Sequence, residues 1–151
     1  MLQEFRHYLY KKIPLTQAMG LQLLEWDEQK LSCQAPLRAN INDKGSVFGG
    51  SSSALMIIAA WSLIKLVCDK QTITADIVIH KNETHWQKAL CSDLFIQASF
   101  NKVYDFQSIK QKIKQKKHQR ITCLVKLTDK DGIIYGTMLA KYVIIPKNKK
   151  G

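Results

Sequence analysis

A pair of glycines opens the most apolar stretch of the chain. Gly49, Gly50 and Ser51 begin this stretch, which is predicted to be helical. The first turn of a helix carries backbone N–H groups without an acceptor inside the helix, and about half a positive elementary charge. Since glycine has no Cβ, a ligand can approach this backbone closely. The Gly50 N–H is therefore our candidate for stabilising an oxygen that gains negative charge. The alternative is that the glycines only let the helix pack closely against a strand.

The loop before the glycines contains one carboxylate, Asp43, next to the amide of Asn42. A carboxylate can accept a proton from water while an amide orients that water, so the pair predicts general base catalysis. An ordinary turn at Asp43, and a loop held together by Asn40 and Asn42, are the alternative interpretations. Ser51 would be a nucleophile only beside a base, so helix capping is the role we expect for its hydroxyl.

The histidines do not predict a metal site. His80 and His85 lie on one predicted strand, and their odd spacing places them on opposite faces. Glu83 shares a face with His85, which leaves two interpretations open: a site near an interface, or a surface pair between neighbouring side chains. We therefore expect no bound metal.

The elements that must position these residues follow the order of an antiparallel sheet around one helix. The helix over 48–69 is apolar on nearly every face, so it must be enclosed. Other helices are predicted over 2–12, 15–19 and 104–117. A hairpin over 21–26 and 31–37 precedes the long helix, and strands over 73–86, 93–100, 121–127 and 133–145 follow it. Strands and helices do not alternate, which predicts an α+β fold with the sheet wrapped around the helix.

Length and composition set further limits. The 151 residues predict one domain over 1–146 and a basic tail over 147–151. The longest apolar run, 54–61, is too short to span a membrane, and no secretory signal is visible at the N-terminus. The four cysteines show no Cys-x-x-Cys spacing and read as reduced core residues. We therefore expect a cytoplasmic protein.

Basic residues outnumber acidic ones, with 23 Lys and Arg against 12 Asp and Glu and a net charge of +11. Such a surface attracts anions. Most of the excess is concentrated in the run over 110–120, which is either a solvated face or a patch that attracts a phosphorylated ligand. Lys88, Arg120 and Lys141 are further candidate cations. Because aromatic residues are not interleaved with the basic run, a nucleic-acid partner is not expected.

One motif resembles a known family. The pattern Asn40-x-Asn42-x-x-Gly45-x-x-Phe48-Gly49-Gly50-Ser51, running into a buried helix, resembles the hotdog fold. More narrowly, it is similar to the thioesterases named for the YiiD C-terminal domain, and the likeness extends from about residue 13 to residue 145. The resemblance implies a homodimer, which could pair into a tetramer. Its two sheets would join edge to edge, with two acyl-thioester sites at the interface.

The resemblance also implies roles for individual residues. The Gly50 N–H would hold the thioester oxygen, and Asn42 and Asp43 would activate water. Many similar thioesterases have a histidine at the helix entry and a carboxylate further along the helix, where this chain has Phe48 and Ile57. No acid precedes Asp69 on the helix, so the general base must come from the loop. The expected substrate-binding residues are Asn40, Phe48, Gly49, Ser51, Ile57 and Trp61, with Met56 and Ala60 also lining the acyl slot. The alternative for Phe48, Met56, Ile57, Ala60 and Trp61 is that they are plain core residues, which a buried helix needs in any case.

These features predict an acyl-thioester hydrolase. Its substrate would be an acyl-CoA or an acyl carrier protein thioester, and no cofactor is expected beyond the coenzyme A of the substrate. Because the helix lacks its carboxylate, the alternative is a non-catalytic acyl-CoA-binding or regulatory module.

Overall fold

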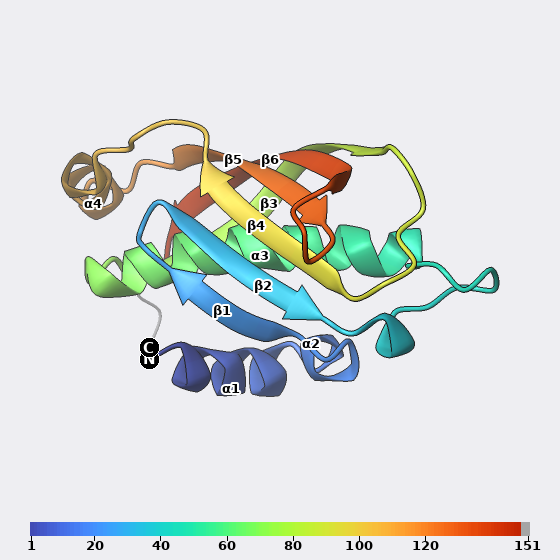
Figure 1. Ribbon diagram of the computed structural model, residues 1–151. Helices are drawn as coiled ribbons and strands as arrows, with labels where there is room; N and C mark the ends of the chain where they lie inside the picture. Colours follow the sequence, from blue (N-terminus) through green and yellow to red (C-terminus); the bar gives the residue numbers. More distant parts are fainter. Residues whose placement is uncertain (149–151) are drawn as a thin grey trace.

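The fold was analysed in a computed structural model that describes residues 1–148; of the predicted basic tail, residues 149–151 lie outside this range. Within the described range, six strands form one sheet in the order β1-β2-β4-β5-β6-β3, and all neighbours are antiparallel. The sheet curves around a long helix, α3 (Figure 1). The α+β hotdog architecture expected from the sequence is therefore confirmed.

The elements lie close to their predicted positions. The helices are α1 (Leu2–Lys12), α2 (Leu15–Ala18), α3 (Gly49–Lys70) and α4 (Phe106–Lys114), with a short 3₁₀ turn at Leu37–Ala39. The strands are β1 (Gln22–Trp26), β2 (Lys30–Ala35), β3 (Ala75–Trp86), β4 (Leu94–Phe100), β5 (Gln119–Thr128) and β6 (Ile134–Pro146).

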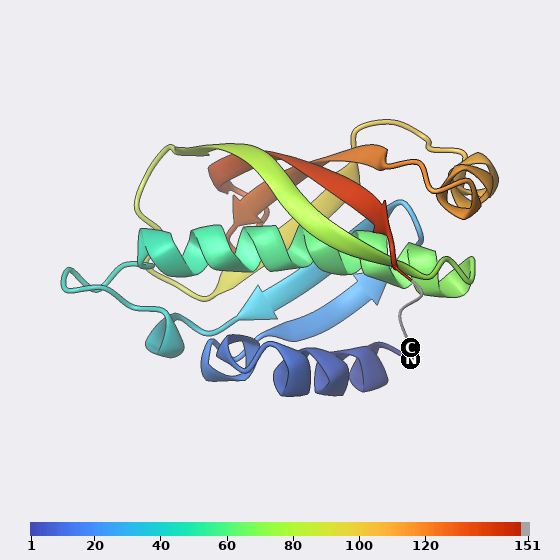
Figure 2. The same ribbon diagram turned by 180° about the vertical axis from the view of Figure 1, so that it is seen from behind.

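The concave face of the sheet encloses α3. Figure 2 shows the helix lying across this face, with β3 running along it. Leu55, Leu63 and Ile64 are fully buried, and burying one such side chain contributes about 1.5–3 kcal/mol relative to leaving it exposed. Hydrogen bonds also join the middle of α3 to the sheet: Trp61 Nε1 donates to the Ile77 carbonyl at 2.9 Å, and the Tyr142 hydroxyl donates to the Ile57 carbonyl at 2.6 Å.

Among the described residues, α3 is the one helix long and apolar enough to cross a membrane by length and composition. Its 22 residues are more than the apolar run over 54–61, which is too short to span a membrane. Because the helix is mostly buried inside the sheet, it is a core helix and indicates no membrane span.

The sheet has two different edges. Helix α1 packs beside β1 at one edge, whereas β3 forms the other with Val78 and Ile79 partly exposed along it. A β-bulge between Ile79 and Lys81 interrupts the alternation of faces. The bulge removes the basis of the expectation that odd spacing places His80 and His85 on opposite faces, because alternation does not continue through it.

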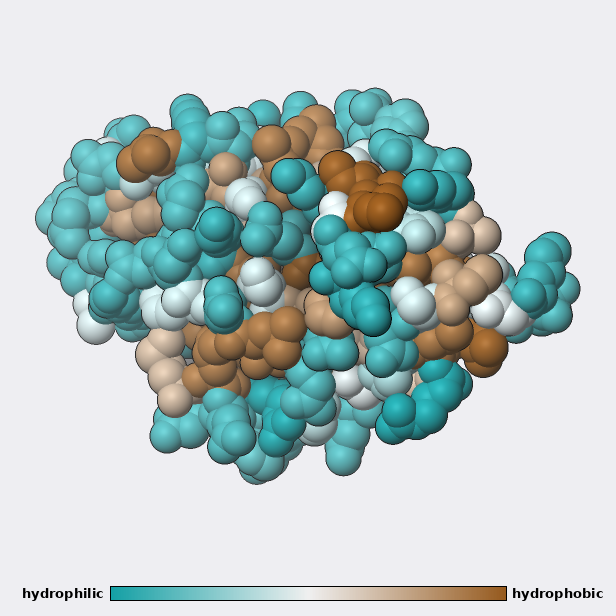
Figure 3. All heavy atoms as spheres, in the orientation of Figure 1, coloured by the Kyte–Doolittle hydropathy of each residue, from teal (hydrophilic) through white to brown (hydrophobic). Residues whose placement is uncertain are grey.

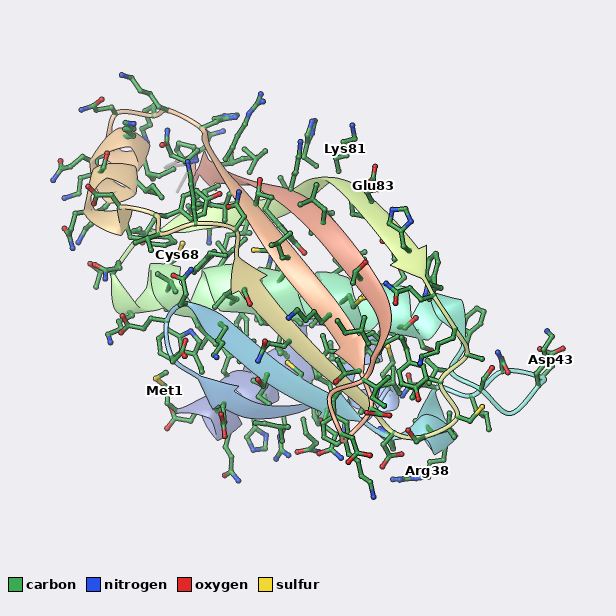
Figure 4. All side chains as sticks on the ribbon, turned by 45° about the horizontal axis from the view of Figure 1, so that its top comes forward. Met1, Arg38, Asp43, Cys68, Lys81 and Glu83 are labelled. Atoms are coloured by element: carbon green, nitrogen blue, oxygen red, sulfur yellow. The ribbon has the colours of Figure 1, made fainter. Side chains whose placement is uncertain are left out.

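Beyond the bulge, Glu83 and His85 share a face, as predicted. Their carboxylate oxygen Oε2 and ring nitrogen Nε2 are 3.6 Å apart, and both side chains are exposed. In Figure 4, Glu83 and Lys81 lie along the free edge of the sheet. This is the geometry of a surface pair on an edge strand.

Three of the four cysteines occupy the core. Cys33, Cys68 and Cys123 are buried, but Cys91 is exposed in the loop between β3 and β4, so the prediction that all four are core residues is wrong for Cys91. All four thiols are free. Burial raises the pKa of Cys33, Cys68 and Cys123 to about 12, so these thiols stay protonated and unreactive at neutral pH.

We expect a thiol reagent such as DTNB to modify only Cys91 in the folded protein at pH 8, and all four thiols after unfolding in urea. Cys91→Ser should abolish the fast reaction, and rapid modification of a second thiol would contradict the buried positions.

Unfolded thiols ionise near pH 9 whereas the buried ones stay protonated to about pH 12. Unfolding therefore releases protons above pH 9, and stability should fall as pH rises through that window.

Candidate functional site

The glycine pair forms the first turn of α3. Phe48 is the N-cap residue with extended backbone angles, and no side chain caps this end of the helix. The capping role expected for Ser51 is therefore wrong. The first turn also contains no acidic residue. The N–H groups of this turn thus receive no side-chain cap, and the positive end of the helix dipole is not neutralised locally.

A hollow of about 340 Å³ lies beside this turn. Gly49 and Ser52 contribute one wall, and Trp86 at the end of β3 contributes another. Val47 and Lys88 also line this hollow, which we call the entrance hollow; its other lining residues are Ser46, Gln87, Ala89, Leu90 and Leu127. The sequence therefore brings residues from three separate segments to the glycine turn.

A chain of hydrogen bonds fixes one wall of the entrance hollow. Trp86 Nε1 donates to Ser52 Oγ at 3.0 Å, and Ser52 Oγ donates to the Gly49 carbonyl at 3.1 Å. The indole of Trp86 also packs on Gly49, where a Cβ would meet the ring at 3.8 Å. We did not predict Ser52 or Trp86 as site residues, because their proximity follows from the register of β3 against α3.

Of the three further candidate cations, Lys88 alone lines the entrance hollow. Its ammonium nitrogen is 4.9 Å from the centroid of the Tyr135 ring, a favourable cation–π geometry. Lys141 is exposed on β6 opposite Thr122, and Arg120 is exposed on β5 opposite Val143. Lys88 is thus the positive side chain available at the hollow.

Phe48 covers part of the glycine turn. Its side chain is 55% exposed, and its ring fills the space that a side chain at Gly50 would occupy, with Cε2 only 2.4 Å from an ideal Cβ position. A side chain at position 50 would therefore displace the exposed ring of Phe48, which belongs to α3's own N-cap and not to a strand. The position that lies against a strand is Gly49, beside Trp86 of β3.

Asn40 and Asn42 tie the loop to its surroundings. Asn40 is almost completely buried, and its Nδ2 donates to the carbonyls of Met19 and Pro36 at 2.9 and 2.8 Å. Asn42 Nδ2 donates to Ser46 Oγ at 2.9 Å, while Asn42 Oδ1 accepts the backbone N–H groups of Lys44 and Ser46. Both amides thus form the local hydrogen bonds that the alternative interpretation described.

Asp43 lies at the tip of the loop, which projects away from the body of the molecule (Figure 4). Its side chain is 80% exposed, and its nearest charged partner is the ammonium of Lys44 at 3.3 Å. It is not among the residues that line the entrance hollow. The structure therefore does not bring the predicted base and the predicted oxyanion donor together within one protomer.

The remaining predicted substrate residues lie along α3. Ile57 and Trp61 are one turn apart and half-buried, and their hydrogen bonds tie this stretch of α3 to β6 and β3. Met56 and Ala60 are fully buried core residues. Ser51 is half-buried within the first turn. None of these five lines the entrance hollow.

The antiparallel sheet around α3 defines a hotdog-fold protein. A family model described as putative thioesterase, the YiiD C-terminal domain, matches residues 2–146, and the chain belongs to this family.

Solved structures share the fold at low sequence identity. A putative thioesterase from Shewanella oneidensis superposes with a TM-score of 0.82 at 21% identity, covering 96% of this chain and 97% of that one. A thioesterase from Haemophilus influenzae gives 0.79 at 10% identity, covering 99% and 95%. A protein of unknown function from Chlorobaculum tepidum gives 0.85 at 19% identity, covering 96% and 94%. The fold is thus retained across large changes in sequence.

Replacing Gly50 by alanine should destabilise the protein by less than about 1 kcal/mol, because the Phe48 ring that the new Cβ would meet is the exposed end of a side chain and can rotate away. Gly49→Ala is the matched control: its Cβ meets Trp86 at an ordinary 3.8 Å, so stability should be unchanged or slightly increased. Urea unfolding measures both. In a Phe48→Ala background the Gly50→Ala loss should disappear; an equal loss in both backgrounds would contradict the clash.

Asn40→Ala should lower the free energy of unfolding by about 1–3 kcal/mol, because the buried carbonyls of Met19 and Pro36 lose their donor. The exposed Asn148→Ala serves as control and should change nothing. Urea denaturation is again the measurement. Unchanged stability in the Asn40 variant would show that its side chain does not hold this loop.

Proposed function

We propose that the protein hydrolyses acyl thioesters of coenzyme A or of an acyl carrier protein, as a cytoplasmic homodimer without a bound cofactor or metal. The observation that carries this proposal is the entrance hollow beside the uncapped first turn of α3. Gly49 lines that hollow and Gly50 does not, so a thioester carbonyl there would have to turn toward Gly50 to meet its N–H at the positive end of the helix dipole. Removing an oxyanion donor of this kind costs about 3–4 kcal/mol of transition-state stabilisation.

The proposed reaction uses water as the nucleophile. Water attacks the carbonyl carbon and forms a C–O bond while Asp43 accepts its proton, and the oxyanion is held by the Gly50 N–H. Collapse of the tetrahedral intermediate breaks the C–S bond, and the thiolate takes the proton back from Asp43. Asp43 is the carboxylate of the loop that leads into α3. To act, the loop over 41–47 must fold inward over the bound thioester, with Asn42 orienting the water.

Substrate contacts would come from the surface around the glycine turn. Phe48, half-exposed over Gly50, would meet the thioester or the start of the acyl chain. Ile57 and Trp61 would line the acyl slot where α3 runs beside β3. Gly49, Ser51 and Asn40 complete the proposed set, with Asn40 acting by holding the loop.

The free edge of β3 supports the proposed homodimer. This strand has 12 residues and exposes Val78, Ile79 and Trp86, the last at 53%. Unpaired N–H and C=O groups along an edge strand favour pairing with another strand. Pairing with β3 of a second copy would join the two sheets, and the entrance hollow at Trp86 would then lie at the interface.

A second candidate is a non-catalytic acyl-CoA-binding module. One observation favours it: no aspartate or glutamate of the described residues lines the entrance hollow. Such a module would bind acyl-CoA at the same surface without turnover.

Thiol release from a panel of acyl-CoA and acyl carrier protein thioesters tests the proposal. Asp43→Asn should lower kcat by about 100-fold or more if Asp43 is the general base. The matched control is Asp131→Asn in the turn between β5 and β6, which should leave turnover unchanged. Saturable acyl-CoA binding with no thiol release by the wild-type protein would reject hydrolysis in favour of the binding module.

A further inference from the structure

A second hollow lies at the opposite end of α3 and is lined by lysines. Its volume is about 510 Å³. We define the lysine pocket by its polar lining residues, which are Thr72, Thr74, Lys110, Lys114, Lys116 and Lys147. They come from the segment after α3, from α4 and its C-terminal end, and from the segment after β6. Figure 3 shows hydrophilic residues gathered on the surface around α4.

We propose that the lysine pocket binds the 3′-phospho-ADP part of a coenzyme A thioester whose acyl end lies in the entrance hollow of the partner subunit. This inference rests on the proposed function and its dimer. It commits to coenzyme A as the carrier of the acyl group.

The charges around the lysine pocket favour an anion. Among residues 1–148, no carboxylate lines it, although four lysines do. Lys110 Nζ donates to Thr72 Oγ1 at 2.6 Å, and Lys147 Nζ is 3.9 Å from a carboxylate oxygen of Asp76. Lys114 and Lys116 form no ion pair with any residue in the described range. The pocket therefore gathers like charges that a polyphosphate would neutralise.

The backbone supports the same interpretation. Three non-glycine residues of the described chain have positive φ, and two of them, Thr72 at 56° and Lys116 at 65°, line the lysine pocket. Each follows the end of a helix, where glycine is the usual residue. For a β-branched residue such as Thr72 this conformation is rare. Glycine at these positions would relieve the backbone but would remove a hydroxyl or an ammonium group from the pocket.

The shape of the pocket fits a nucleotide better than a nucleic-acid strand. The side chains of Ile73, Ile113 and Pro146 give it an apolar part, which suits a purine ring, and the lysines surround that part. The part of the chain that the structure describes contributes no aromatic side chain to the pocket on which successive bases could stack.

The topology relates the two hollows. Within one protomer they lie at opposite ends of α3, whose 22 residues span about 33 Å. The lysine pocket includes Thr74, directly before β3, and the entrance hollow includes Trp86, the last residue of β3. Two antiparallel copies of β3 that pair about their midpoints place the start of one strand beside the end of the other. Each lysine pocket would then lie next to the entrance hollow of the partner.

The first experiment compares the double variant K114E/K116E with the control Lys130→Glu, an exposed lysine in the turn between β5 and β6. We expect the double variant to raise KM for an acyl-CoA at least 10-fold with kcat unchanged, and to leave turnover of the matching acyl-pantetheine unchanged. The control should behave like the wild type. Equal losses for both substrates, or a loss confined to acyl carrier protein thioesters, would overturn the inference.

Binding without turnover separates this inference from the proposed function. Adenosine 3′,5′-bisphosphate should bind the wild-type protein in a calorimetric titration, and K114E/K116E should weaken its binding at least 10-fold. Pyrophosphate alone should bind more weakly. If the wild type releases no thiol from any substrate, the proposed function fails, and this titration alone decides the inference. No binding of the bisphosphate by the wild type would overturn it.

Mixed dimers test the contribution of the partner. Gly50→Val and K114E/K116E each damage both sites of their own homodimer. Turnover is measured at an acyl-CoA concentration well below the wild-type KM, where the K114E/K116E homodimer is slow. In a mixed dimer that uses pockets across subunits, one site carries both defects and the other carries none, so about half of the wild-type acyl-CoA turnover should return. If hollow and pocket of the same protomer served one site, each site would keep one defect. Absence of recovery, with both variants folded by circular dichroism, would overturn the cross-subunit arrangement.

Discussion

The enclosure of α3 is the constraint on which the rest of the structure depends. A helix that is apolar on nearly every face cannot lie on the surface of the protein. The strands that precede it and the strands that follow it in the sequence must therefore enclose it. Five of the six strands contact α3, while β1 extends the sheet beyond it and is covered by α1. The sheet order follows from this requirement, because β2 and β3, which flank α3 in sequence, must reach different sides of it.

The same enclosure fixes where the ends of α3 emerge. Most side chains of α3 pack in the core, so the backbone N–H groups of its first turn are the groups that a ligand could meet. Phe48 and Trp86 limit access to this turn from two sides. Carboxylates are absent from the first turn, so the charge of the helix end is not cancelled. A binding surface made of backbone groups needs few particular side chains, which is consistent with a fold retained at 10–21% identity among solved structures.

Much of the fold could be predicted because hydrophobic periodicity and turn residues are local signals. The α1 boundaries agree with the prediction, and neighbouring strands are antiparallel, as predicted.

The features that were missed depend on neighbours distant in sequence. The bulge at His80 arises from pairing with β6, and the exposure of Cys91 from the path of a loop. Likewise, Ser52 and Trp86 are 34 residues apart, and only the register of β3 brings them together. The motif located the glycine turn, but the loop hydrogen bonds of Asn42 could not be read from residue types alone.

The polarity of α3 connects the two hollows physically. Its N-terminal end presents positive partial charge to the entrance hollow, where an oxyanion would form, and its C-terminal end presents carbonyl groups of negative partial charge toward the segment that borders the lysine pocket. Cations are stabilised near helix C-termini, and α4 also ends at this pocket. Two helix ends therefore reduce the repulsion among the lysines without any carboxylate entering the pocket, so that the ammonium groups remain available to phosphates. In a dimer joined along β3, the antiparallel arrangement of the two central helices would set one helix's positive end beside the lysines gathered at the other's negative end. Both features favour an anion, and in the proposed dimer they would act on opposite ends of the same thioester.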